Sequence, residues 1–251
     1  PTALQFPGLD RWIVAAAPPE RKSLDVGPSA LTPISAAAVD EMALAVGSQP
    51  SLTGETVSVG LAFNAGSSAI TAISFATDLS TLRTETNGVA GADIQWVRVS
   101  DTLIRGVVDG AVAVELRLVA PGTIPAGTDG TVTIQVTLLG PIDHALAAFA
   151  DLGTIGVVVT SSVGSATAQV GVSVQDDAPT AVADAAAVVT EDGATTTASG
   201  NVLDNDTLGS DRPATVEWST ADPAIAALKN YGALAQGADG AWSFTLDNTL
   251  A

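Results

Sequence analysis

The sequence contains no cysteine among its 251 residues, so disulfide bonds, zinc–thiolate sites and thiol nucleophiles are excluded. Positive charge is also scarce, because 9 lysines and arginines stand against 27 acids, which gives a net charge of −18. Such a chain repels nucleic acid and anionic lipid, and positive counterions are its natural partners. Alternatively, the charge only keeps an apolar, β-rich chain soluble and apart from its copies.

Long apolar runs are missing as well, since none approaches the roughly 18 residues of a membrane-spanning helix, and we expect no membrane insertion. The most hydrophobic stretch, residues 152–174, is interrupted by polar residues and predicts paired strands. Histidine occurs once, at His144, and a Ser–His–Asp site would have to be built around it. We interpret His144 as a turn residue beside Asp143 and predict that the chain is not an enzyme.

What the chain has in abundance is alternation of apolar and polar residues from about residue 55 onward. This period of two predicts half-buried strands with one wet face. Between residues 55 and 175 there is room for about eight of them, enough for one antiparallel sandwich. The residues predicted to point inward are Val57, Val59, Leu61, Phe63, Val112, Val114, Leu116, Leu118, Val132, Ile134, Val136, Leu138, Val170, Val172 and Val174.

Turn and helix signals punctuate these strands. Asp109-Gly110 is the strongest hairpin signal, and a change of phase between Trp96 and Val97 predicts a bulge. Short helices are expected at residues 142–150 and 223–230.

Composition divides the chain into three parts. Residues 1–33 are proline-rich and aperiodic, which predicts a linker or the end of a preceding unit. Residues 34–175 form the predicted sandwich, and residues 176–251 a second β-unit after a stiff joint at Pro179. We expect this second unit to be incomplete and the sequence to be a piece of a longer chain.

Acidic residues concentrate where the second unit begins. Repulsion between such carboxylates is relieved in solvent or by a cation, and oxygen ligands without histidine or cysteine favour Ca²⁺. An EF-hand loop beginning at Asp204 fails at Leu208 and Thr215, where oxygen ligands are required. A solvated acidic loop is the alternative. The candidate calcium ligands are Asp176, Asp177, Glu191, Asp192, Asn201, Asp204, Asp206 and Asp211.

Two segments of this region resemble a known repeat. "DDAPTAVADAAAVVTEDGATTTASGNVLDNDTLGSD" and then "YGALAQGADGAWSFTLDN" are similar, in order, to VCBS or bacterial cadherin-like repeats of type I-secreted, RTX-type giant adhesins. The preceding residues, with "VDEMAL" and "LLGPIDHAL", look like the Ig-like repeat that often precedes them. The resemblance implies an all-β chain of tandem antiparallel Ig-like and cadherin-like β-sandwiches, the second one truncated.

The same resemblance implies a function, which is a calcium-stabilised extender in a bacterial surface adhesin that serves cell adhesion and biofilm formation. Its expected location is the secreted, bacterial cell-surface space, and its expected partners are calcium ions and neighbouring repeats of the same chain. One alternative is a module that binds a host or matrix sugar or peptide, to which one of the four tryptophans could contribute a stacking surface. Another is an accessory domain of a large secreted hydrolase.

Overall fold

The computed structural model describes residues 25–83, 94–119, 122–142, 148–210, 214–219 and 221–249, together with two short paired strands, β1 (Ala3–Leu4) and β2 (Ile13–Val14). Within these ranges the chain is almost entirely β-structure, with one 3-10 helix, η1 (Glu41–Ala43), and one α-helix, α1 (Pro223–Leu228). The all-β prediction is confirmed. Neither helix in the described ranges has the length and apolarity to cross a membrane.

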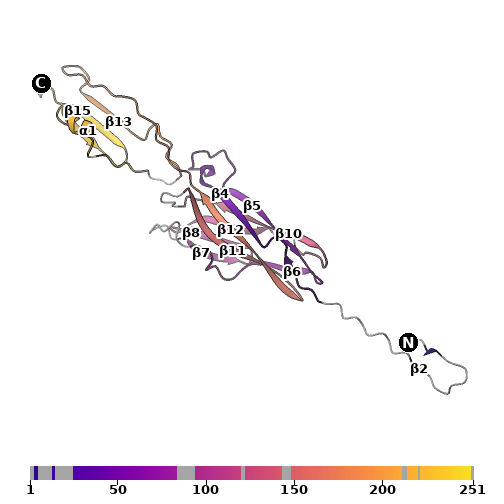
Figure 1. The fold of residues 1–251 in the computed structure, drawn as a ribbon. Helices are drawn as coiled ribbons and strands as arrows, with labels where there is room; N and C mark the ends of the chain where they lie inside the picture. Colours follow the sequence, from indigo (N-terminus) through magenta and orange to yellow (C-terminus); the bar gives the residue numbers. More distant parts are fainter. Residues whose placement is uncertain are drawn as a thin grey trace.

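Ten strands form a two-sheet sandwich (Figure 1). The six-stranded sheet has, in spatial order, β3 (Ser29–Ala30), β5 (Thr56–Asn64), β10 (Asp129–Leu138), β9 (Ala111–Val119), β8 (Leu103–Val108) and β7 (Gln95–Ser100). The four-stranded sheet has β4 (Ile34–Asp40), β12 (Gly164–Gln175), β11 (Phe149–Ser161) and β6 (Ile70–Phe75).

One pair in this sandwich is parallel, whereas the sequence predicts antiparallel pairing. β3 pairs antiparallel with β5, and the chain then crosses at residues 31–33 to the other sheet, where β4 runs parallel to β12. Pro33 lies at this crossing and cannot donate to either ladder. The chain keeps its direction when it changes sheet. The direction of β4 relative to β12 is therefore set by this crossing and not by a hairpin. β3 also places residues 29–30 in the sandwich, although residues 1–33 are predicted as a linker.

The core lies between the two sheets, and most of the alternating residues fill it as predicted. Val112 is instead half-buried and Ala113 is buried, next to a register shift between Gly106 and Val107. Leu61, Phe63, Ile134 and Val170 are fully buried. Glu115 and Arg117 of β9 lie on the outer face, also as predicted. Burial of each large aliphatic or aromatic side chain contributes about 1.5–3 kcal/mol, so this two-sheet core carries most of the stability of the described chain.

The predicted hairpin turn is confirmed, and the predicted bulge lies two residues further along the chain. Asp109 and Gly110 join β8 to β9 with φ angles of 50° and 81°, the pair of positive values that a type I′ hairpin turn requires. The bulge lies between Arg98 and Ser100, two residues later than predicted. Trp96 and Val97 remain in regular register, and the irregular step follows Arg98. The Arg98 side chain donates hydrogen bonds to the Phe75 carbonyl oxygen and to Asp101 Oδ1.

Of the two predicted helices, only the second is confirmed. Asp222 caps the first turn of α1 by accepting from the Ala224 amide, and Pro223 fits that turn because its missing N–H needs no partner. Residues 143–147 of the other predicted helix, which include His144, lie outside the described residues. Phe149 and Ala150 begin β11, so the helix prediction is wrong there. Ala150 is buried opposite Val174 in the ladder, and this tertiary pairing overrides local helix propensity.

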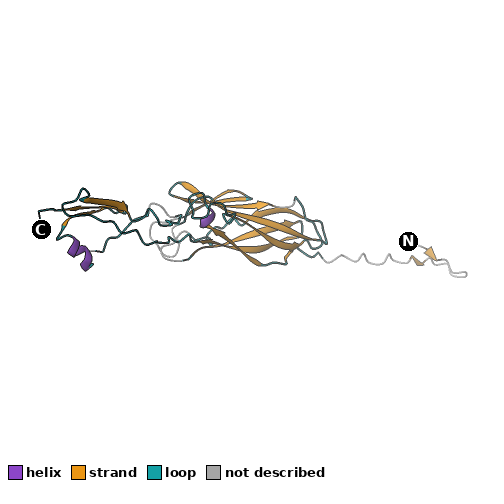
Figure 2. Cartoon of the chain, turned by 90° about the horizontal axis from the view of Figure 1, so that it is seen from above, coloured by secondary structure: helices purple, strands orange, loops and turns teal. Residues whose placement is uncertain are grey.

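Beyond the sandwich lies a smaller β-unit, here named the C-terminal unit (residues 176–249). Its three-stranded antiparallel sheet has the order β13 (Thr197–Asn201), β15 (Ala241–Leu246) and β14 (Gly232–Gln236). Phe244 is buried on one face, with Trp242 and Leu246 half-buried beside it, as their shared phase predicts. Both views place this unit past the end of the sandwich where β12 stops (Figures 1 and 2).

Candidate functional site

The predicted calcium ligands are spread along the C-terminal unit. Asp176 and Asp177 follow β12 directly, Asn201 ends β13, and Asp204 and Asp206 lie in the turn after it. Among the described residues no group of three or more acids or histidines is arranged to hold a metal ion. Asp211 lies outside the described residues.

Glu191 and Asp192 lie in the turn that precedes β13, whereas Asp204 and Asp206 follow it. A strand rises about 3.3 Å per residue, so the five residues of β13 separate the two turns by about 16 Å. One ion cannot be shared across that distance. The two acidic turns therefore lie at opposite ends of β13, and the calcium assignment of their residues stays a prediction.

The turn at residues 201–206 uses its polar side chains to fix the backbone. Asn201 Oδ1 accepts from the Leu203 amide at 2.9 Å, and Asn201 Nδ2 donates to the Asp239 carbonyl at 3.0 Å. Asp206 Oδ1 accepts from the Val182 amide at 2.7 Å. Asn201, predicted as a calcium ligand, thus has a structural role, because both polar atoms of its amide already hold the fold.

Asp177 connects the C-terminal unit to a distant loop of the sandwich. Its side chain is buried, with only 5% of the residue exposed. Oδ2 accepts from the Ser48 amide and Oδ1 from the Ser48 hydroxyl, each at 2.6 Å. Ser48 lies 129 residues earlier, in the loop that follows η1. Both oxygens of this predicted calcium ligand are therefore engaged by protein donors.

Glu41 makes a second connection that sequence reasoning missed. This residue is fully buried in η1. Its Oε1 accepts from the Ile142 amide at 2.6 Å, and its Oε2 accepts from the Ser210 hydroxyl at 2.7 Å. Ser210, only 1% exposed, comes from the C-terminal unit, 169 residues later. The only signal was a pair of acids, Asp40 and Glu41, beside apolar residues in "VDEMAL", and a local pattern of that kind does not identify a partner.

These two carboxylate–serine pairs, Asp177–Ser48 and Glu41–Ser210, are here named the clasp. A hydrogen bond to a charged group contributes about 1.5–3 kcal/mol, and a buried carboxylate that loses its partner destabilises the fold more strongly. The backbone approaches closely at the same place, since Gly209 has a φ of +73° and a Cβ there would meet the carbonyl oxygen of Asp177. The joint between the two units is thus a buried contact and not a free linker.

A bridge between Thr180 and Thr207 completes the joint. Their amides and carbonyls exchange two hydrogen bonds, of 2.8 and 3.0 Å. This bridge ties the chain segment that leaves the sandwich to the segment that returns to it. The two segments are therefore paired to each other beside the joint.

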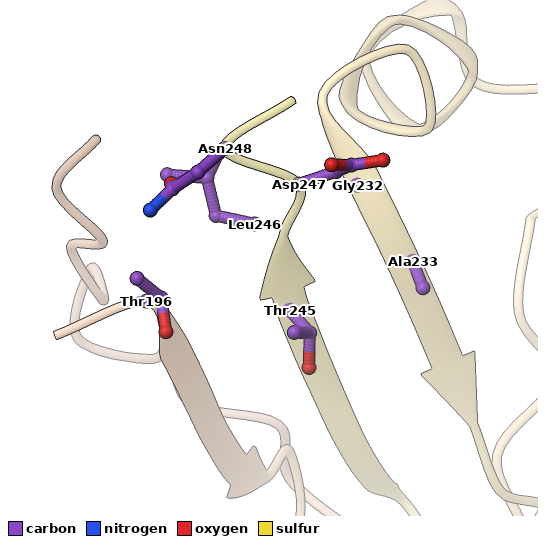
Figure 3. Close-up of a pocket in the computed structure, with 7 residues that line it drawn as sticks. All are labelled: Thr196, Gly232, Ala233, Thr245, Leu246, Asp247 and Asn248. Carbon is purple, nitrogen blue, oxygen red and sulfur yellow. The ribbon is translucent and has the colours of Figure 1, made fainter. Parts of the chain in front are cut away.

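The C-terminal unit also has a hollow of about 450 Å³ at one end of its sheet (Figure 3). Among the described residues that line it, Asp247 is the one titratable group; the others are Thr196, Gly232, Ala233, Thr245, Leu246 and Asn248. Asp247 Oδ1 accepts from the amide and hydroxyl of Thr249, and these bonds hold the pKa of Asp247 below its ordinary value. Acid–base catalysis commonly uses a pair of titratable groups, and the described lining residues of this hollow supply Asp247 alone.

Comparison with known proteins adds little to this geometry. No family model and no curated protein matches the chain. The solved structure of zebrafish RET cadherin-like domains 1 to 4 aligns with 90% of this chain and 44% of that one, at 11% identity and a TM-score of 0.23. This chain thus spans less than half the length of that structure, and the score is too low to support a functional argument. The similarity to VCBS repeats stays a prediction.

Proposed function

We propose that this chain is a structural extender in a secreted bacterial surface adhesin, stabilised by calcium and joined end to end with neighbouring repeats. The observation that supports the proposal is the joint. Two β-units lie one after the other along the molecule, with buried carboxylates at their contact (Figures 1 and 2). Such a segment holds a distant adhesive domain away from the cell surface.

The physical requirement on an extender is resistance to bending at each joint. A flexible linker would let adjacent units collapse onto each other, because its end-to-end distance grows only with the square root of its length. Here the chain leaves the sandwich at Asp177 and returns to it at Ser210, and both residues are buried against the sandwich. The joint therefore favours one orientation of the two units.

The calcium ion of this proposal would bind at the turn of residues 201–206. Asp204 is exposed there, and Asp206 binds the Val182 amide through Oδ1, so carboxylate oxygens are available to a cation. Calcium shells are commonly completed by backbone carbonyls and water, so two carboxylates can suffice as protein anchors. A bound ion would offset the mutual repulsion of the acids in this strongly negative chain.

Thermal melting with millimolar calcium, with magnesium and with chelator tests this role. We expect a calcium-specific rise in Tm of the C-terminal unit, since a ligand at a hundred times its Kd stabilises the folded form by about 2.7 kcal/mol. The double variant Asp204→Ala/Asp206→Ala should lose this rise. The charge-matched control Asp25→Ala/Glu217→Ala, at exposed residues outside the turn, should retain it. Coincident melting curves for the parent chain would instead identify the acidic turn as solvated surface.

A further inference from the structure

We propose that the clasp, and not a bound cation, sets the orientation of the C-terminal unit on the sandwich. The two carboxylate–serine pairs would then keep the joint closed in the absence of calcium. This inference deepens the proposed extender role and rests on it. In this proposal calcium stabilises the C-terminal unit, whereas the clasp sets the geometry of the joint.

The first support is the engagement of the carboxylate oxygens at the joint. All four oxygens of Glu41 and Asp177 accept a hydrogen bond from the protein, at 2.6–2.7 Å. The two amide donors lie closer than is usual for N–H···O hydrogen bonds, and the two hydroxyl donors lie within the usual O–H···O range. A cation would have to compete with donors that the fold already holds in place.

The second support is the placement of the two pairs. Ser48 fixes the point where the chain leaves β12, because its partner Asp177 lies two residues after that strand. Ser210 fixes the point where the returning segment meets η1. Attachment at two points resists bending and twisting, whereas the single covalent connection at residue 176 would restrain neither.

The third support is that the clasp is buried while the candidate calcium turn is exposed. Glu41, Asp177 and Ser210 are at most 5% exposed, and Asp204 lies on the surface of the C-terminal unit. The described side-chain hydrogen bonds of residues 201–206 are all made within the C-terminal unit, so an ion held by that turn would contact this unit. It would therefore stabilise that unit without fixing its angle to the sandwich.

Distance measurements between two spin labels test the proposal. The chain has no cysteine, so cysteines introduced at the exposed positions Ser58 and Thr245 place one label on each unit without further changes. The parent chain and a clasp variant, Asp177→Ala/Ser210→Ala, which removes both bonds to Ser48 and the bond to Glu41, are each measured with calcium and with chelator. The control is Ser68→Ala/Ser162→Ala, which removes a hydroxyl pair (2.7 Å) at the opposite end of the sandwich.

We expect the parent and the control to give the same single narrow distance with calcium and with chelator. The clasp variant should lose that narrow distance even with calcium, while amide hydrogen exchange in β10 and β11 stays unchanged and shows that the sandwich is folded. A parent whose distance broadens in chelator would overturn the proposal and leave the calcium-stabilised extender intact. A clasp variant that remains narrow would overturn it as well. Calcium-independent melting would instead contradict only the calcium role.

Discussion

At the scale of single residues, the outer face of the six-stranded sheet carries a compact group of charges. Glu115 accepts from Arg117 at 2.7 Å and from Arg105 at 3.1 Å. The Glu115 side chain is 16% exposed, that of Arg117 is 48% exposed and that of Arg105 is 40% exposed. The hydrogen bond from Arg117 is the main cause that lowers the pKa of Glu115, with Arg105 adding to it against the opposing effect of burial.

This geometry predicts a pH-dependent contribution to stability. Because the folded-state pKa of Glu115 is depressed, its contribution is complete above the ordinary value of 4.5 and is lost as pH falls through the folded pKa. Glu115→Gln should lower the free energy of unfolding by about 1 kcal/mol at pH 7, a value typical of surface ion pairs, and by much less at pH 3. Urea denaturation at both pH values measures this, with exposed Glu217→Gln as control. An equal loss at both pH values would contradict the assignment.

At the scale of secondary-structure elements, the β8–β9 hairpin depends on backbone conformation more than on contacts. Gly110 has a φ of +81°, and no atom lies within 4 Å of where its Cβ would be. A substitution there meets no steric obstacle outside the turn. Its cost therefore comes from the left-handed conformation alone.

Two substitutions at Gly110 separate backbone strain from packing. Gly110→Val should destabilise the protein by about 1–2 kcal/mol, the cost of placing an L-residue in the left-handed region. Gly110→Asn should cost clearly less, since asparagine adopts positive φ angles more readily. Urea denaturation of both variants measures the difference. Equal effects of valine and asparagine would show that the turn is not under this constraint.

At the scale of the whole molecule, apolar burial is distributed unevenly. The continuous core of the described residues runs from Ala37 to Val174, entirely within the sandwich. In the C-terminal unit, Phe244 is the one buried large apolar side chain among the described residues, at 4% exposure. That unit therefore depends strongly on its hydrogen bonds and on its attachment to the sandwich.

This imbalance predicts that the two units open independently. Segments with few buried apolar contacts have low free energies of local opening, so amides of β13, β14 and β15 should exchange much faster than those of β10 and β11. Hydrogen–deuterium exchange with peptide-level mass spectrometry measures both regions in one experiment. Uniform protection across the chain would mean that the joint couples the units into one cooperative fold.

Sequence alone predicted the features that depend on local patterning. The inward positions of Val132, Ile134 and Val136 follow from a side-chain period of two, which is a property of any strand. The Asp109-Gly110 turn and α1 follow from conformational preferences of a few adjacent residues. The concentration of acids around the joint was also visible in the sequence, and the calcium role given to Asp177 among them stays a prediction.

The partners at the joint were decided by tertiary structure. Asp177 was predicted as a calcium ligand, but folding places it against Ser48, 129 residues away. Glu41 and Ser210, 169 residues apart, carried no local signal of their pairing. The sequence could show where acidic residues need a compensating partner, because their mutual repulsion follows from how many of them lie close together along the chain. The identity of that partner depends on the crossing between sheets and the return of the chain to η1, which bring distant segments together only in the folded state.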